Sequence, residues 1–320
     1  MAKCSVLITS SSSKAPLLDS IWNLCQKYSL DVQIVAGDSN AEAITSYLPF
    51  DFWQMPRLSS ENLNEIRSEV VRRGIDLIIP TRDAELQLLA KNRESFKEKG
   101  INISVSDPTV VEICIDKLLF FKEFARDLPV IPTTDRDGLI ELDCERYVVK
   151  ERYGSGSKMN AINVTLDEAI FHANSIDNPI FQPYIAGIEY SIDTYTDMNE
   201  KVLGVVARRR DLVQNGESQV TTAIPDRRLE EFGRHVAQTI GFKGHANIQV
   251  IEQGSTLKII ECNARIGGAS TLSFHCGLIS PIWAIIESIG GSLIDYPFTP
   301  LKSKIQMIRH KKDSYFDLGA

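Results

Sequence analysis

The sequence predicts an α/β protein with a parallel sheet in its first third and antiparallel sheet in its C-terminal part. In the first third, short apolar runs alternate with segments of helical period that end at glycine, which is typical of strands covered by helices. From Tyr190 onward, polar and apolar residues alternate and turn residues separate the runs. At 320 residues and 43% hydrophobic content, the chain is long enough for two or three domains.

We expect the N-terminal strands over residues 4–9, 31–36, 76–80 and 101–105, with helices over 17–28, 61–73 and 84–99. Ligands of parallel sheets bind beyond the carboxyl ends of the strands. Thr81 and Asp83 follow such an end and are candidates for holding an ammonium or hydroxyl group of a substrate. The serines after the first strand lack the G-x-G-x-x-G spacing, which disfavours nicotinamide binding, and they could equally cap a helix.

The middle of the chain contains two lysines in suggestive positions. Asp107-Pro108 starts a helix predicted over 107–127, and Lys117 lies on it, where a solvated helix charge is the simplest interpretation. Lys150 ends a strand predicted over 147–150 and precedes a loop of glycines and serines, Gly154, Ser155, Gly156 and Ser157. Such a loop can bind phosphate through its backbone N–H groups, although a flexible hairpin loop explains the glycines about as well.

Polar residues end the second strand of a hairpin predicted around Gly254-Ser255. Glu261, Asn263 and Arg265 share one side of that strand by its period of two, and the paired strand would bring Gln249 or Asn247 beside them. Carboxylate and amide oxygens suit Mg²⁺, while an adjacent arginine suits phosphate. Polar residues at a strand end also commonly form caps and turns, so the local pattern leaves both interpretations open.

Candidate groups for binding a substrate anion lie on both sides of this hairpin. Arg208, Arg209 and Arg210 fall at the end of a strand and could clamp a carboxylate, or form surface salt bridges. Gly267 and Gly268 could form a nest of backbone N–H groups.

Composition narrows the class of protein. The net charge of -7 provides no basic surface for nucleic acid. The chain has neither an apolar segment long enough to span a membrane nor a signal peptide, which predicts a cytoplasmic protein without membrane contact. Its six cysteines are dispersed, so neither a zinc site nor a disulfide framework is indicated.

Taken in order, these motifs resemble the ATP-grasp superfamily, in particular its carbamoyl phosphate synthetase large-subunit-like and carboxylate-amine ligase members. The resemblance implies an N-terminal parallel α/β (pre-ATP-grasp) domain over 1–110, a small α+β flap region over 111–186 and a C-terminal α+β domain with antiparallel sheet over 187–320. It implies that ATP is bound by Lys117, Lys150, the loop from Gly154 to Ser157, Gln182, the backbone of Ile185, and Glu189. Metal binding is assigned to Gln249, Glu261 and Asn263, and catalysis to Arg265, Lys150 and Asn263.

The chain departs from this family at two positions. Glu151 stands where a proline is common, and Gln249 is an amide where many relatives have a carboxylate. The resemblance implies ATP and Mg²⁺ as cofactors, with Mn²⁺ as a substitute, and a ligase that joins a small-molecule carboxylate to an amine through an acyl phosphate. Phosphorylation of bicarbonate or carbamate and an ATP-binding regulatory or scaffold protein without turnover are the alternatives, and a homodimer is left open.

Overall fold

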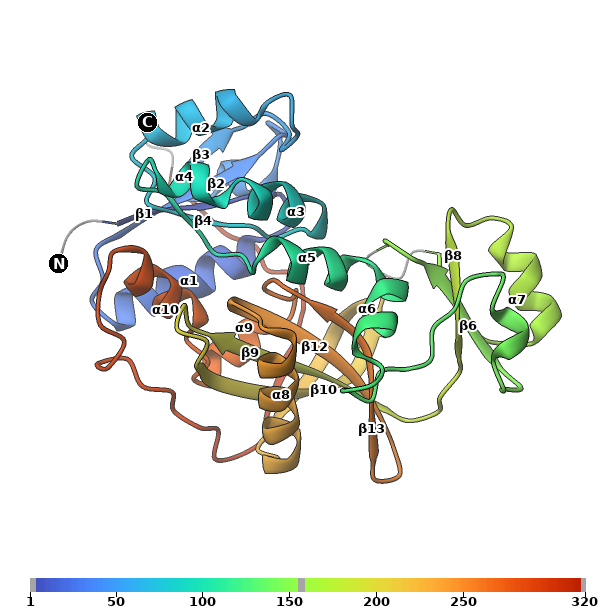
Figure 1. The fold of residues 1–320 in the computed structure, drawn as a ribbon. Coiled ribbons are helices and arrows are strands. Elements are labelled where there is room, and N and C mark those ends of the chain that lie inside the picture. Colours follow the sequence, from blue (N-terminus) through green and yellow to red (C-terminus); the bar gives the residue numbers. More distant parts are fainter. Residues whose placement is uncertain (1–3, 155–158, 318–320) are drawn as a thin grey trace.

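The structure, a computed structural model, describes residues 4–154 and 159–317. In this part of the chain, three sheets are arranged side by side: a five-stranded parallel sheet, a three-stranded antiparallel sheet and a six-stranded antiparallel sheet. Figure 1 shows the parallel sheet above the six-stranded sheet, with the three-stranded sheet set apart beside them. The expected α/β class, with parallel sheet first and antiparallel sheet later, is confirmed.

The parallel sheet has the strand order β3-β2-β1-β4-β5. Its strands are β1 (Cys4–Ile8), β2 (Val32–Asp38), β3 (Asp51–Gln54), β4 (Leu77–Ile79) and β5 (Asn102–Ile103), and its helices are α1 (Ala15–Lys27), η1 (Ile44–Tyr47), α2 (Leu63–Arg72), α3 (Asp83–Lys91) and α4 (Arg93–Lys97). The helix predicted over 84–99 is interrupted at Asn92, whose side-chain amide donates to the carbonyl of Leu88. This contact competes with continued helix and separates α3 from α4.

The prediction of one helix over 107–127 is wrong. The chain forms α5 (Pro108–Ile115) and α6 (Lys117–Phe124), which meet at Asp116. Asp116 is extended and its carboxylate accepts from the backbone N–H groups of Leu118 and Leu119, the arrangement of a helix N-cap. Lys117 is therefore the first residue of a new helix rather than a charge on the side of a longer one.

The three-stranded sheet has the order β7-β6-β8. Its elements are η2 (Leu139–Glu141), β6 (Tyr147–Glu151), β7 (Ala161–Val164), α7 (Leu166–Ala173) and β8 (Pro179–Pro183). Pro183 ends an edge strand, where its missing N–H costs nothing, as the sequence indicates. Leu139, Val149 and Phe181 belong to a small apolar cluster of this sheet, which is separate from the two larger apolar clusters of the molecule.

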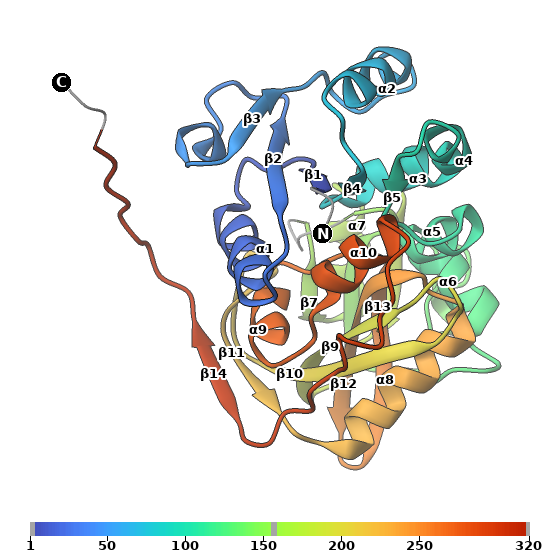
Figure 2. The ribbon, with the colours of Figure 1, turned by 90° about the vertical axis from the view of Figure 1, so that its left-hand side faces the viewer.

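The six-stranded sheet has the order β13-β12-β9-β10-β11-β14. Its elements are β9 (Ile188–Thr196), β10 (Val202–Gln214), β11 (Glu217–Ile224), α8 (Arg227–Ile240), β12 (Gly244–Gln253), β13 (Thr256–Asn263), α9 (Ser270–His275), α10 (Ser280–Ser288) and β14 (Ile305–Ile308). In Figure 2, α8 lies against this sheet, while α1, α9 and α10 gather on another side of it. The predicted β12–β13 hairpin is confirmed, with Gly254 at the turn in the left-handed region (φ 63°).

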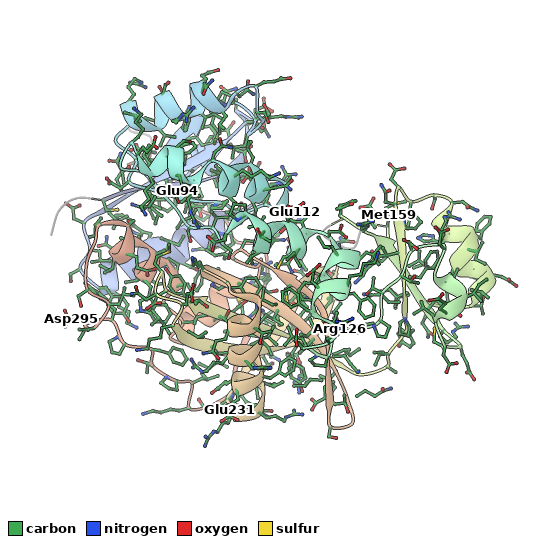
Figure 3. The ribbon with its side chains drawn as sticks, viewed as in Figure 1. Glu94, Glu112, Arg126, Met159, Glu231 and Asp295 are labelled. Carbon is green, nitrogen blue, oxygen red and sulfur yellow. The ribbon has the colours of Figure 1, made fainter. Side chains whose placement is uncertain are left out.

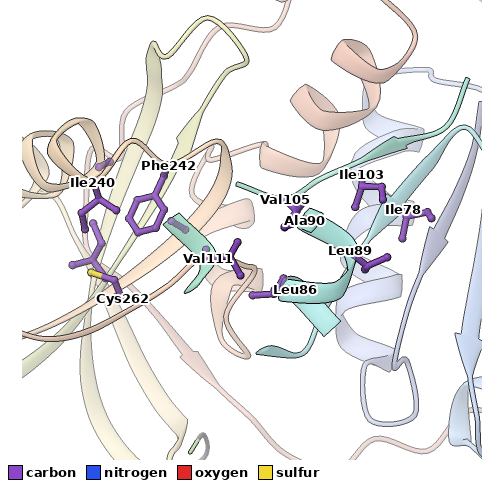
Figure 4. Close-up of a cluster of buried hydrophobic side chains, with 14 of the residues drawn as sticks. Ile78, Leu86, Leu89, Ala90, Ile103, Val105, Val111, Ile240, Phe242 and Cys262 are labelled. Atoms are coloured by element: carbon purple, nitrogen blue, oxygen red, sulfur yellow. The ribbon is translucent and has the colours of Figure 1, made fainter. Parts of the chain in front are cut away.

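A continuous apolar cluster joins the parallel sheet to the six-stranded sheet. It runs from Leu86 of α3 through Val111 of α5 to Phe242 and to Cys262 of β13. Figure 4 shows these side chains in a chain of contacts between the two sheets. Because close-packed interiors resist deformation, the end of β13 is held in a defined place relative to the ends of the N-terminal strands. No helix in the described ranges is long and apolar enough to cross a membrane.

Candidate active site

A cleft of about 1180 Å³ lies where the three sheets face one another. Met159, one of its lining residues, lies on the side of the three-stranded sheet that faces the rest of the molecule (Figure 3). The cleft also contains every site residue predicted from the sequence that the structure describes: Thr81, Asp83, Lys117, Lys150, Gly154, Gln182, Ile185, Glu189, Arg208, Arg209, Arg210, Gln249, Glu261, Asn263, Arg265, Gly267 and Gly268. The predicted loop residues Ser155, Gly156 and Ser157 lie outside the described residues.

The hairpin brings the three predicted metal ligands together. In its register Gln249 lies opposite Glu261, while Asn263 lies two residues further along β13 on the same face. The Nδ2 atom of Asn263 donates to Oε1 of Glu261 at 3.3 Å. No cluster of three or more His, Cys, Asp or Glu side chains suited to a metal occurs in the described part of the chain. One carboxylate and two amides fit Mg²⁺ only if phosphate oxygens and water complete its coordination.

Two lysines face Glu261 in the cleft. Burial disfavours the carboxylate form of Glu261, but Lys117 and Lys150 outweigh that effect and lower its pKa. Burial lowers the pKa of Lys150 to about 8, although Glu261 and Glu189 favour its charged form. Lys150 is only 5% exposed. A buried ammonium with a second ammonium beside it is suited to an additional anion, because the anion would favour its charged form.

Lys117 is held by the segment that follows Lys150. Its Nζ donates to the carbonyl of Gly154 at 2.6 Å, and its backbone N–H donates to the carbonyl of Arg152 at 3.3 Å. Arg152 in turn forms a two-point ion pair with Asp116, the N-cap of α6. The carboxylate of Asp116 thus fixes the start of α6 and the end of β6 together, which places both lysines on the same side of the cleft.

The residues predicted to bind adenine and ribose line the cleft where β8 leads into β9. Gln182 is buried, and its Nε2 donates to Oγ1 of Thr133 at 2.7 Å. Glu189 lies 3.3 Å from Nε of Arg210. Ile185 is on the connection between the two strands.

The three consecutive arginines of β10 have different surroundings. Arg208 is 1% exposed and pairs with the buried Asp193, with Nη2 at 2.8 Å from Oδ2. Arg210 lies on the same face by the alternation of the strand, and its Nη2 donates to the carbonyl of Gly216 at 3.1 Å. Arg209 alternates to the other face of the strand, where its Nε donates to Asp211 at 2.5 Å, although part of the residue still lines the cleft. The predicted arginine clamp is therefore divided between the two faces of the sheet.

The remaining predicted residues are bound to groups of the protein itself. Arg265 forms a two-point ion pair with Asp83, with Nε at 2.7 Å from Oδ1. The hydroxyl of Thr81 donates to the carbonyl of Thr9 at 2.8 Å. The N–H of Gly267 donates to Oγ of Ser270 at 3.0 Å, and the carbonyl of Gly268 accepts from Arg309. The N–H of Gly267 is therefore already bonded to Ser270, and it does not point into an anion-binding nest as predicted.

Two protein-family models match parts of the chain. The family described as "ATP-grasp in the biosynthetic pathway with Ter operon" matches residues 175–311, and the family described as "PylC-like, N-terminal domain" matches residues 6–104. No curated protein matches the sequence significantly.

Solved structures resemble the chain over nearly its full length. N5-carboxyaminoimidazole synthetase from Staphylococcus aureus, complexed with ADP, is 17% identical with a TM-score of 0.71, and the match covers 93% of this chain and 80% of that one. The biotin carboxylase domain of 2-oxoglutarate carboxylase from Hydrogenobacter thermophilus, in complex with MgADP, ADP and bicarbonate, is 18% identical with a TM-score of 0.69, covering 92% and 72%. The biotin carboxylase from Campylobacter jejuni is 16% identical with a TM-score of 0.70, covering 90% and 71%.

The chain has the ATP-grasp fold. The cleft is also lined by Lys14 and Arg82, which sequence reasoning missed. Outside the lining, the ion pair of Arg152 and Asp116, also missed, holds the end of the cleft that carries the two lysines. Lys14 follows the serine run at the end of the first strand, and Arg82 lies between the two candidates Thr81 and Asp83. Both residues follow the end of a predicted strand, and this position could have marked them as candidates. The sequence pattern does not show which of these loops meet in the fold.

Proposed function

We propose that this chain is a Mg-ATP-dependent ligase that joins a carboxylic acid to an amine through an acyl phosphate. The observation that carries the proposal is the meeting of Lys117, Lys150 and Glu261 with the amides of Gln249 and Asn263 in one cleft. This set combines cations for phosphate with oxygen ligands for a hard metal ion. The ATP-grasp fold of the chain and its similarity to carboxylases and a synthetase described with ADP support it.

In the proposed reaction, a carboxylate oxygen of the acid attacks the γ-phosphorus of ATP, and ADP leaves with the bond electrons. The amine then attacks the acyl carbon, phosphate leaves, and the amine loses a proton. Mg²⁺, when held by Glu261, Asn263 and Gln249, supplies charge neutralisation at the phosphate oxygens. Lys150 and Lys117 bind phosphate oxygens, and Arg265 stabilises the transferring phosphoryl group. The three-stranded sheet shields the acyl phosphate from water.

We place the nucleotide between the three-stranded and six-stranded sheets. Gln182 and the backbone of Ile185 would contact the adenine edge, and Glu189 the ribose hydroxyls, because all three line the end of the cleft near β8. The loop from Gly154 to Ser157 would cover the phosphates. In these terms the chain divides into an N-terminal substrate domain (1–110), a flap region (111–186) and a C-terminal metal-site domain (187–320).

Phosphorylation of bicarbonate or carbamate is the second candidate. One structural neighbour is described in complex with MgADP and bicarbonate, and this favours bicarbonate as an acid of the same chemistry. That neighbour is also described as a dimer. A homodimer of this chain and its cytoplasmic location remain predictions; light scattering and cell fractionation would check them.

The test is release of ADP and phosphate from Mg-ATP with pools of amino acids, small acids, amino sugars and bicarbonate, with hydroxylamine added to trap acyl phosphate. A hydroxamate from an organic acid supports the ligase. Bicarbonate-stimulated ADP release without an organic acid favours the second candidate. Glu261→Ala should reduce turnover at least about tenfold, since metal clamping contributes several kcal/mol. ATP binding without turnover in every pool would instead indicate a regulatory or scaffold protein.

A further inference from the structure

A second group of cations lies at the cleft near Arg265: Lys14 and Arg82 line the cleft, and Arg309 borders it. Lys14 precedes α1, at the carboxyl end of β1, and Arg82 precedes α3, at the carboxyl end of β4. Arg309 follows β14 and donates to the carbonyl of Gly268, which also lines the cleft. Three separate segments of the chain therefore place positive charge at one end of this cavity.

The charged groups of the cleft form two sets of interacting residues that share Arg265. The charged groups that act on Lys150 are Glu261, Lys117 and Glu189. Those that act on Lys14 are a different set, namely Arg265, Glu217, Arg309 and Arg82. Arg265 belongs to both sets, because it also acts on Glu261. The end around Lys14 is thus distinct from the end that we assign to the nucleotide.

The cations at this second end are not fully compensated by carboxylates. Arg265 pairs with Asp83, and Arg309 pairs with Glu217 at 3.2 Å. Within residues 4–154 and 159–317, neither Lys14 nor Arg82 has a carboxylate within ion-pair distance, as the pairs found there do not include them. Deeper in the same cleft wall, Nη1 of the buried Arg208 has no hydrogen-bond partner. A buried donor without a partner is costly unless a ligand satisfies it.

Lys14 is also unfavourable for the stability of α1. It occupies the N-cap position of α1 and makes no side-chain cap hydrogen bond. Ser, Thr, Asp and Asn are preferred at that position, and a cation at a helix N-terminus is repelled by the helix dipole. Burial and the neighbouring Arg265 guanidinium lower the pKa of Lys14, so both disfavour its charged form. An anion bound beside Lys14 would offset this cost, because it favours the charged form of the lysine.

We propose that this end of the cleft, formed by Lys14, Arg82 and Arg309, binds a second anionic group, a carboxylate or a phosphate, on the acid substrate. The inference rests on the proposed ligase function. The reacting carboxylate would lie near Arg265, which the two sets share, and the distal anion would lie toward Lys14. The acid is accordingly a dicarboxylate or a phosphorylated carboxylate rather than a simple monocarboxylic acid.

The first test divides the acids of the hydroxamate assay into three pools: monocarboxylates, dicarboxylates, and carboxylates that carry a phosphate. We expect hydroxamate from one of the last two pools, and which of them responds identifies the distal group. For the responding acid, Lys14→Gln and Arg82→Gln should each raise KM about tenfold or more with little change in kcat, since a charged hydrogen bond is lost at a site remote from the reacting atoms. Hydroxamate from monocarboxylates alone would overturn the proposal while leaving the ligase function intact.

The second test does not depend on turnover. With MgADP saturating the nucleotide end, millimolar inorganic phosphate and glutarate are titrated into the full chain and followed by thermal shift. We expect an upward shift with at least one anion, reduced in Lys14→Gln and retained in Lys27→Gln, which removes an exposed lysine from the other end of α1. The Lys14→Gln protein alone should melt no lower than the wild type. Absence of any shift in the wild type, or an equal shift in Lys14→Gln, would overturn the proposal.

Discussion

Arg265 and Asp83 form a two-point ion pair although 182 residues separate them in the chain. Asp83 is the first residue of α3 at the carboxyl end of β4, and Arg265 follows β13 just beyond the candidate metal residues. The side chain of Asp83 is 19% exposed and that of Arg265 is 17% exposed. Because both ends of the carboxylate engage the guanidinium, the pair fixes the orientation of the arginine as well as its position.

Asp83→Asn should therefore reduce turnover about tenfold or more, because Arg265 would lose the group that orients it toward the phosphoryl group. The free energy of unfolding should fall by only about 1–3 kcal/mol, as the pair is partly exposed. Steady-state kinetics and urea denaturation measure the two quantities. Asp295→Asn, at an exposed position, is the matched control and should change neither. Turnover equal to the wild type in Asp83→Asn would show that the pair has only a structural role.

Lys150 predicts a pH dependence of stability in the ligand-free protein. Its pKa is about 8 in the fold against 10.5 for an ordinary lysine, so the unfolded chain binds more protons between these values and stability rises with pH there. Below pH 8 Lys150 is charged in the folded protein, and burial of this charge then lowers the free energy of unfolding by its full amount. Lys150→Met should remove this rise and increase the free energy of unfolding at pH 7 by about 1–3 kcal/mol. Urea denaturation from pH 7 to 10.5 tests both statements.

The same titration should govern nucleotide binding. ATP affinity should decline above pH 8 in the wild type as the ammonium is lost, and should be at least about tenfold weaker in Lys150→Met at pH 7. Lys122→Met, on the exposed side of α6, serves as the control and should behave like the wild type. An affinity that is flat with pH in the wild type would contradict the placement of Lys150 against the phosphates.

Asp116 combines a helix cap with an ion pair, and two substitutions separate these contributions. Asp116→Asn keeps a cap oxygen and loses the charge that binds Arg152, whereas Asp116→Ala loses both. We expect the alanine variant to be about 1 kcal/mol less stable than the asparagine variant. Both should weaken ATP binding, since Lys117 and the end of β6 would no longer be held together. Isothermal titration and urea denaturation give the two readouts; equal stabilities would show that the cap contributes nothing.

Asp193 supports the buried side of the cleft. Burial alone would raise its pKa, but Arg208 and His245 outweigh burial and hold the pKa well below the ordinary value of 3.8. Its contribution to stability is therefore complete above pH 4 and is lost as the pH falls through the folded value. Asp193→Asn should cost about 3–5 kcal/mol, because Arg208 would remain buried and unpaired. Asp211→Asn, which disturbs the more exposed pair with Arg209, should cost under about 1 kcal/mol.

The sequence predicted the elements whose signals are local. The β12–β13 hairpin follows from Gly254 and from the alternation on each side of it. The sequence left Gln249 and Asn247 as alternatives beside Glu261, and the register pairs Gln249 with it. The break at Asp116 was missed because apolar residues continue on both sides with helical spacing, although aspartate is itself a favoured cap. Local pattern showed a helix on each side and could not show that the carboxylate turns back to cap the second one.

The site was predictable only as a set of residue types. Arg265 was expected near phosphate, and Asp83 near a substrate, but no pattern in the sequence joins an aspartate after β4 to an arginine after β13. The same holds for Lys14 and Arg309, which approach each other only because the loops after β1 and β14 reach the same end of the cleft. Contacts of this kind depend on how sheets pack, which side-chain alternation within one strand does not encode.

The three-stranded sheet has an apolar cluster of its own, separate from the continuous cluster that joins the other two sheets. The apolar packing of the three-stranded sheet is therefore formed within that sheet and its helix. The cleft, in contrast, needs residues of the other sheets as well. Such a piece can open as a unit, and the amide protons of β6 and β8 would exchange with solvent through an opening that leaves β1, β4 and β9 protected. We therefore expect opening on this side of the cleft, and sequence changes within that small core should alter its rate without touching a residue proposed to bind a ligand.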